Sequence, residues 1–99
     1  MPLRFEIEET GEEVTLYLAG KLSREVFDDF LDVLVSVKCQ DRHLVLDVGW
    51  VTSVDNCGLG VLLSARDTTG ATGVLIRGAS DELRQILGLV NLGQPFEIE

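Results

Sequence analysis

The stretch from Leu44 to Leu63 constrains the fold of this 99-residue chain more than any other feature. It opens with Leu44–Val48, a short apolar run interrupted only by Asp47, which is typical of a strand buried on both faces. A short loop containing Trp50 follows, and a helix is expected to begin near Cys57. A buried strand that leads directly into a helix is an element of small α/β sheets with parallel strands.

Two alternating segments precede this stretch. Phe5–Glu8 and Val14–Leu18 alternate apolar and polar residues, which is the period of half-buried strands, and a turn at 10–12 separates them. The sequence therefore predicts an antiparallel hairpin that ends at Gly20.

The first predicted helix begins after Ser23, a residue type that favours the N-cap position. Apolar residues then recur at the three- and four-residue spacing of an amphipathic helix. The residues expected on its inward face are Val26, Phe27, Phe30, Leu31, Leu34 and Val35.

The second predicted helix covers residues 57–67 and turns Leu59, Leu62 and Leu63 inward. It points Arg66 and Asp67 outward, and the glycine-containing segment 69–73 ends it. A further buried strand is expected at 74–76, because this segment is apolar throughout.

Ser80 is predicted to cap a third helix, which ends at Gly88 or Gly93. Phe96–Ile98 then forms an edge strand or an extended tail. The predicted fold is α/β: a mixed, mostly parallel sheet of four to five strands that starts with an antiparallel hairpin. Its helices are expected to pack mainly on one face.

The composition predicts one domain over residues 1–99, because 45% apolar residues suffice for a hydrophobic core. The net charge of -9 argues against binding to nucleic acid or to an anionic membrane surface, since both require a basic protein face. No apolar run approaches the roughly 20 residues that span a bilayer, so we expect a cytoplasmic protein without membrane insertion.

The residues that carry chemistry do not form a catalytic or metal-binding pattern. His43 is the sole histidine, and it belongs at the start of a strand that ends before Cys57. The predicted strand also separates Cys39 from Cys57 by more than the roughly 7 Å that a disulfide spans between Cα atoms. We therefore expect reduced thiols, no metal, no cofactor and no enzymatic activity.

Four residues near the predicted helix start have two interpretations each. Asp47 either accepts backbone N–H bonds and fixes the following loop, or lies beside the helix N-terminus and shapes a binding site. Asp55 is an N-cap or a site residue, and Cys57 is a half-buried packing residue or a reactive thiol. Trp50 covers the edge of the core or contacts a partner.

Four segments, taken in this order, resemble the STAS domain, which is typified by bacterial anti-sigma factor antagonists. The segment 20–22 resembles the step before the first helix of the family, and Leu44–Val48 resembles its central strand. Val54–Leu63 resembles its Asp-Ser-Ser/Thr-Gly-Leu helix start, and 86–98 resembles its last helix and strand.

The resemblance implies a non-enzymatic regulator of transcription that binds an anti-sigma factor, which is also a serine kinase. In the family, phosphorylation of the Ser or Thr just before the glycine prevents this binding, and that position is Cys57 here. A cysteine does not accept phosphate from such a kinase. The residues expected to contact the partner are Asp47, Trp50, Asp55, Asn56, Cys57, Gly58 and Leu59.

Two alternatives stay open beside the antagonist. STAS proteins also resemble regulatory subunits of membrane ABC transporters, which bind an ATPase subunit, and the absent phospho-acceptor fits that function. The second alternative is a thiol sensor, in which oxidation of Cys57 adds charge and bulk where phosphate would. Binding of a small ligand ranks last, because the loops contain no recognisable phosphate-binding motif.

Overall fold

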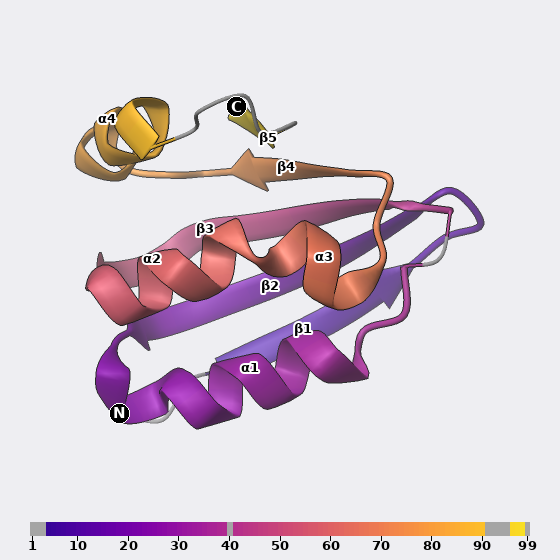
Figure 1. Ribbon diagram of the computed structural model, residues 1–99, viewed down its shortest axis with the longest axis horizontal. Helices are drawn as coiled ribbons and strands as arrows, with labels where there is room; N and C mark the ends of the chain where they lie inside the picture. Colours follow the sequence, from indigo (N-terminus) through magenta and orange to yellow (C-terminus); the bar gives the residue numbers. More distant parts are fainter. Residues whose placement is uncertain (1–3, 40, 91–95, 99) are drawn as a thin grey trace.

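The computed structural model describes residues 4–39, 41–90 and 96–98. The described part forms a sheet and helices that alternate along the chain, as Figure 1 shows. The elements are β1 (Arg4–Glu9), β2 (Glu13–Leu22), the 3-10 turn η1 (Arg24–Val26), α1 (Phe27–Ser36), β3 (His43–Val54), α2 (Asn56–Leu63), α3 (Ala65–Thr69), β4 (Gly73–Arg77), α4 (Asp81–Val90) and β5 (Phe96–Ile98).

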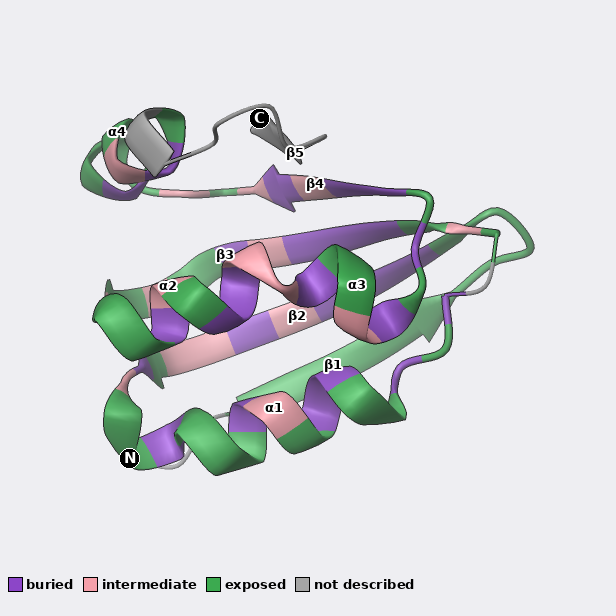
Figure 2. Ribbon diagram, viewed as in Figure 1, coloured by how far each residue is buried: buried purple, intermediate pink, exposed green. Residues whose placement is uncertain are grey.

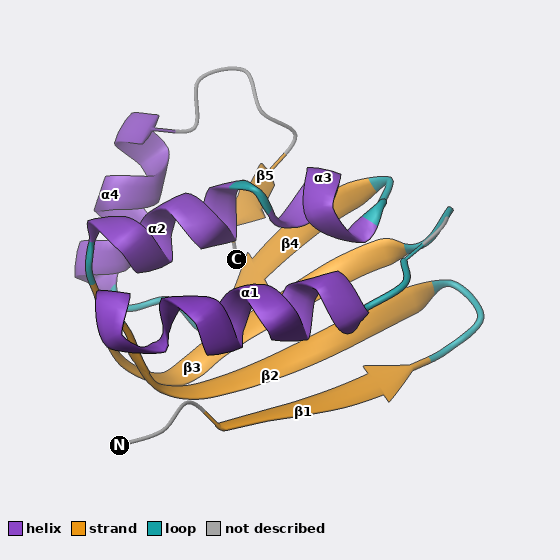
Figure 3. Cartoon of the chain, turned by 60° about the horizontal axis from the view of Figure 1, so that its bottom comes forward, coloured by secondary structure: helices purple, strands orange, loops and turns teal. Residues whose placement is uncertain are grey.

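The sheet has the strand order β1-β2-β3-β4-β5. β1 and β2 form the predicted antiparallel hairpin, whereas the pairs β2–β3, β3–β4 and β4–β5 are parallel. Helices α1, α2 and α3 lie on one face of this sheet (Figure 3). The fold class and the edge-strand interpretation of Phe96–Ile98 are therefore confirmed.

The sequence predicted that the hairpin ends at Gly20, and this prediction was wrong. β2 continues to Leu22, which pairs with Val54. Gly20 adopts a φ of 104°, a left-handed backbone conformation that glycine tolerates without steric cost. The glycine therefore lets the strand bend and continue, and it brings the carboxyl end of β2 beside that of β3.

β3 is much longer than the predicted strand and contains the segment that the sequence assigned to a loop. Its first half, 43–47, pairs with β2 on one side and β4 on the other. Its second half, 48–54, pairs with β2 alone, with register shifts between Tyr17 and Ala19 and between Gly20 and Lys21. Such irregularities bend a strand while keeping it in the sheet, so no loop is needed before the helix.

The hydrophobic core lies between the sheet and the helices, and Figure 2 shows the buried residues along β2 and β3. α1 contributes Phe30 and Leu34 to this core, as predicted. Phe27 and Val35, however, are 37% and 54% exposed, and Val33 is buried instead. Helical positions 30, 33, 34 and 37 also follow the spacing of one face, so α1 is rotated slightly from the predicted orientation.

The helix predicted at 57–67 is divided in two at Ser64. The backbone N–H of Ser64 donates to the carbonyls of Gly60 and Val61, and α3 begins at the next residue. Leu62 is buried as expected, whereas Leu59 and Leu63 are only partly buried. The outward orientation of Arg66 and Asp67 is confirmed, because both are exposed.

α4 begins as predicted, because the Ser80 hydroxyl accepts a hydrogen bond from the Leu83 backbone N–H at 3.2 Å. Gly88 does not end the helix, which continues to Val90, and Gly93 lies outside the described residues. The second half of β3 and α4 together line a pocket of about 150 Å³, to which Val51 and Ile86 contribute.

Candidate functional site

Asp55 joins the starts of two helices through its carboxylate. Its Oδ1 accepts the backbone N–H of Gly58 at 2.9 Å, and its Oδ2 accepts that of Arg24 at 2.8 Å. These hydrogen bonds, first from Gly58 and then from Arg24, hold the pKa of Asp55 below its ordinary value. The N-cap interpretation of Asp55 is confirmed, and the same side chain also fixes η1, which leads into α1.

Gly58 is the point where α2 contacts the end of β2. A Cβ atom built at this position would lie 2.1 Å from the backbone oxygen of Leu22, which no real side chain tolerates. The backbone N–H of Asp55 donates to the same oxygen at 3.1 Å. Gly58 therefore positions the first turn of α2 directly against the sheet, and its role in the motif is structural.

The residues between Asp55 and Gly58 remain on the surface. Asn56 and Cys57 are both exposed, and Leu59 in the next position is partly buried. The expectation that Cys57 is half-buried was wrong, because the contact with Leu22 is made by Gly58 and turns its neighbour outward. The thiol-sensor hypothesis stays a prediction.

Asp47 lies on the other side of the sheet from the helices. Its Oδ1 accepts the backbone N–H of Gly49 at 3.0 Å, which confirms the interpretation that its carboxylate fixes the segment that follows. Its Oδ2 forms an ion pair with Arg77 at 3.2 Å. The whole second half of β3, roughly 25 Å of strand, separates Asp47 from Asp55. The alternative interpretation, which placed Asp47 beside the helix N-terminus, was therefore wrong.

Sequence reasoning had missed Arg77 and Tyr17 as the neighbours of Asp47. Tyr17, Asp47 and Arg77 are register partners across β2, β3 and β4, so their side chains share one face. The Arg77 guanidinium lies 5.9 Å from the centre of the Tyr17 ring, which is a cation–π distance. Asp47 lies near the end of one predicted strand, and Arg77 directly follows the next one. Because neighbouring parallel strands bring equivalent ends together, these opposite charges could have predicted the contact.

The sequence predicted Trp50 in a loop, but the residue lies in β3, where it pairs with Ala19. Its side chain is 77% exposed, the largest exposed fraction among the large apolar residues of the described chain. Ala19 lies two residues after Tyr17 on β2, so Trp50 belongs to the same helix-free face as Asp47. The predicted site residues therefore divide between two surfaces. Asp55–Leu59 form the α2 start, whereas Asp47 and Trp50 lie with Tyr17 and Arg77 in a helix-free patch.

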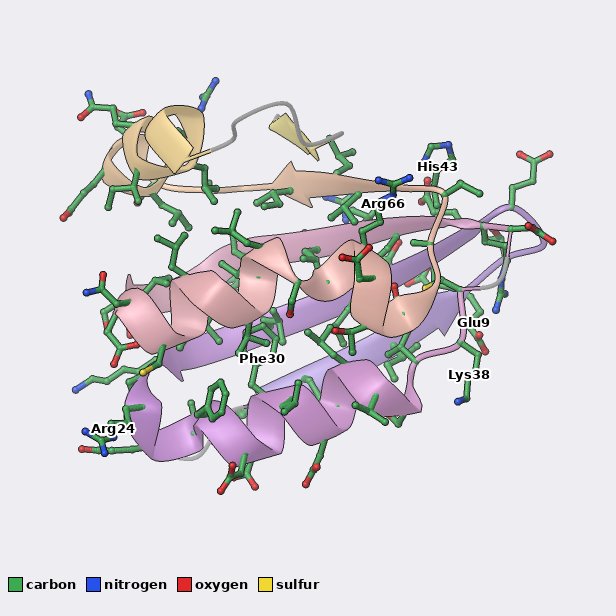
Figure 4. All side chains as sticks on the ribbon, in the orientation of Figure 1. Glu9, Arg24, Phe30, Lys38, His43 and Arg66 are labelled. Atoms are coloured by element: carbon green, nitrogen blue, oxygen red, sulfur yellow. The ribbon has the colours of Figure 1, made fainter. Side chains whose placement is uncertain are left out.

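The two cysteines lie apart and the histidine lies at the start of β3, as the sequence predicted. Both thiols are free, with Cys39 buried and Cys57 exposed. Burial raises the pKa of the Cys39 thiol, against a smaller opposing effect of its hydrogen bond with Thr69. Figure 4 shows His43 at one end of the molecule and Arg24, whose backbone N–H binds Asp55, at the other. His43 and Cys57 therefore do not meet.

The described residues contain neither a metal-binding cluster nor a membrane-spanning helix. Among residues 4–39, 41–90 and 96–98, no group of three or more His, Cys, Asp or Glu side chains has the geometry to hold a metal ion. Within the same segments, no helix has both the length and the apolar character needed to cross a membrane.

Comparisons with known proteins agree with this geometry. Residues 5–98 match the family described as "Mlab, STAS domain". A STAS-domain containing protein of Pseudomonas aeruginosa (strain UCBPP-PA14) is 32% identical over 90 residues, which are 89% of each chain. The chain therefore belongs to the STAS domain family.

Solved structures of the same fold include anti-sigma factor antagonists. An antagonist described as putative, from Thermotoga maritima, superposes with a TM-score of 0.72 at 19% identity and covers 95% of this chain and 84% of its own. Phosphorylated SpoIIAA, a cell fate determinant of Bacillus, has a TM-score of 0.67 at 18% identity, covering 97% and 91%. The fold is thus that of SpoIIAA.

Proposed function

We propose that this protein is a regulator that binds another protein stoichiometrically and catalyses no reaction. The observation that carries the proposal is the α2 start, where Asp55 and Gly58 hold Asn56 and Cys57 exposed on a fixed helical turn. A rigid, exposed turn loses little conformational entropy when a partner covers it. In this proposal Asn56, Cys57 and Leu59 contact the partner, whereas Asp55 and Gly58 position them.

The first candidate partner is an anti-sigma factor with serine kinase activity, in the cytoplasm of a bacterium. Its support is the likeness to SpoIIAA, an anti-sigma factor antagonist whose structure is known in unphosphorylated and phosphorylated forms. Cys57 takes the place of the phospho-acceptor and is close to serine in size. The proposed interface is therefore permanently competent, because no phosphate of nearly two negative charges is added to it.

The second candidate partner is the ATPase subunit of a membrane ABC transporter. The exposed Cys57 favours it, because a transporter subunit requires no phosphorylation switch at this position. The α2 start remains the proposed contact in both cases. Trp50 and Asp47 are proposed as a second contact, which a partner reaches by extending around the carboxyl end of β3.

Capture from a lysate of the source organism tests the contact. Wild type and two variants, Cys57→Glu and Thr72→Glu, are immobilised, and retained proteins are identified by mass spectrometry. Thr72 is exposed and lies just before β4, whose first residue pairs with the first residue of β3. A glutamate at position 72 therefore adds the same charge at the end of β3 that is far from Cys57. We expect loss of the partner with Cys57→Glu and full retention with Thr72→Glu; equal retention by both contradicts the proposal.

A third variant, Cys57→Ser, separates the two candidate partners. With the captured partner and ATP, an anti-sigma kinase is expected to phosphorylate the new serine and then release the protein. An ATPase subunit is expected to bind the variant without modifying it. Intact-protein mass spectrometry detects the phosphate, and size-exclusion chromatography detects the release.

A further inference from the structure

β1 forms one edge of the sheet, and its outer side has no neighbouring strand in the described part of the chain. All six of its side chains are exposed, and Figure 2 shows this along the whole strand. The outer edge of such a strand presents a row of backbone N–H and C=O groups that can pair with another extended chain. The identity of its side chains then decides which chain is accepted.

The two faces of β1 differ in chemistry. Phe5 and Ile7 pair with the core residues Leu18 and Leu16, so they lie on the helix side, yet they remain 47% and 42% exposed. Glu6 and Glu8 pair with Tyr17 and Thr15 on the helix-free side. Arg4 precedes the two glutamates on the helix-free side, and Glu9 follows Phe5 and Ile7 on the helix side, where it forms an ion pair with Arg42. The middle of the edge, residues 5–8, therefore presents apolar groups on one side and carboxylates on the other.

Glu8 is also held in this orientation by its neighbour. The Tyr17 hydroxyl donates a hydrogen bond to Glu8 Oε2 at 3.4 Å, and the Tyr17 ring lies next to Arg77. A hydroxyl donor leaves the negative charge of the carboxylate unneutralised. The excess negative charge of the protein, -9 in total, attracts cationic segments from solution to such a row.

We infer that the outer edge of β1 binds an extended segment of a partner protein in which lysine or arginine alternates with apolar residues. The segment adds a strand to the sheet through main-chain hydrogen bonds, as in β-strand addition. Its basic side chains lie beside Glu6 and Glu8, and its apolar side chains cover Phe5 and Ile7. This edge is distinct from the α2 start, so the inference does not depend on the partner proposed there.

A second copy of the chain is a poorer occupant of the same edge. Two β1 strands that pair antiparallel about Ile7 set Glu6 of each copy against Glu8 of the other, and like charges directly opposite destabilise a sheet. Charged residues on edge strands are a common protection against such self-association. A basic partner turns the same repulsion into attraction.

A peptide titration tests the inference. The probe is a dye-labelled seven-residue peptide of alternating lysine and valine, and its control has the same composition with all lysines first. Fluorescence anisotropy is expected to show about tenfold tighter binding of the alternating peptide, because only its side chains match both faces of β1. Hydrogen exchange of the β1 amides is expected to slow in the complex; equal affinity of the two peptides overturns the inference.

Paired variants separate the edge from general charge attraction. Glu6→Gln with Glu8→Gln is expected to weaken binding about tenfold, since two opposite-charge cross-strand pairs are lost. Asp67→Asn with Glu82→Gln removes the same charge from exposed positions on α3 and α4 and is expected to leave the affinity nearly unchanged. Equal weakening by both pairs overturns the inference, as does a concentration-dependent dimer that excludes the peptide. Cys57→Glu is expected to bind the peptide normally, which keeps this outcome separate from that of the α2 start.

Discussion

The two halves of β3 contrast sharply, although they belong to one strand. The first half, 43–47, is paired on both sides and contains Leu44, Val45 and Leu46, all nearly fully buried. The second half, 48–54, is paired on one side, shifts register twice and exposes Trp50. The half with two neighbouring strands contributes mainly to the stability of the fold. The half with one neighbouring strand can instead hold side chains at the surface.

Leu46→Ala is expected to give the largest effect, because it creates a cavity in the first half of β3. Leu46 is completely buried, and truncation of such a leucine costs about 2–5 kcal/mol of unfolding free energy. Urea unfolding followed by circular dichroism measures the loss. A loss below about 1 kcal/mol would contradict the contrast between the two halves.

Gly58→Ala tests the contact through which the second half of β3 leads into α2. The new methyl group meets the Leu22 backbone oxygen, so we expect a loss of about 1–3 kcal/mol. Gly60→Ala is the control, since a Cβ there has no atom within 4 Å and alanine is expected to stabilise the helix by about 0.4–1 kcal/mol. Thermal melts of the two variants should therefore move in opposite directions.

Asp55→Asn keeps a side-chain acceptor for Gly58 but removes the charge, and a smaller loss of stability is expected. The folded-state pKa of Asp55 is lowered, mainly by the hydrogen bond from Gly58. Its charge therefore stabilises the fold above the unfolded-state pKa of about 3.9, and the contribution disappears as the pH falls through the folded-state value. Urea unfolding at pH 7 and pH 3 should show a larger difference from wild type at pH 7 than at pH 3; a difference that does not change with pH contradicts the assignment.

The ion pair between Asp47 and Arg77 lies at the end of the first half of β3, and its contribution to stability should be modest. The two side chains are 19% and 36% exposed, so solvent weakens their attraction. A double-mutant cycle with Asp47→Asn and Arg77→Gln is expected to give a coupling free energy of about 0.5 kcal/mol. A coupling above about 2 kcal/mol would place this pair with the core instead of the surface.

Trp50→Ala should have the smallest effect on stability, within about 0.5 kcal/mol, because its side chain is 77% exposed. Its effect on partner capture is expected to be larger, since exposed tryptophans are frequent binding hot spots. Chemical denaturation and the capture experiment, performed on the same variant, measure the two effects. A variant that is clearly less stable yet captures its partner normally would show that Trp50 serves stability and not binding, which contradicts the proposed difference between the two halves of β3.

The sequence predicted the buried half of β3 well and the exposed half poorly, for a physical reason. Leu44–Leu46 is an unbroken apolar run, which suits a strand that has neighbours on both sides and buries all three side chains. Gly49, Thr52 and Ser53 are residue types common in turns, so the second half was predicted as a loop. Only pairing with a β2 that extends past Gly20 keeps this segment in the sheet, and that pairing is a tertiary property.

The candidate site was also predictable in part. Asp55 and Gly58 lie within one motif, so the local sequence identified the cap and the helix start. The contact between Asp47 and Arg77 joins residues 30 positions apart and depends on the register of β3 with β4. The position of Trp50 relative to Asp47 follows from a register shift, which no spacing rule reveals.

The contrast between the two free cysteines has a practical consequence. The Cys39 thiol is fully buried, and burial raises its pKa, so little reactive thiolate is available there. Cys57 is exposed at the first turn of α2. A maleimide dye should therefore label the unmodified chain at one position, and that position lies within the proposed contact. The natural protein already contains the attachment point for a spectroscopic reporter of its own binding.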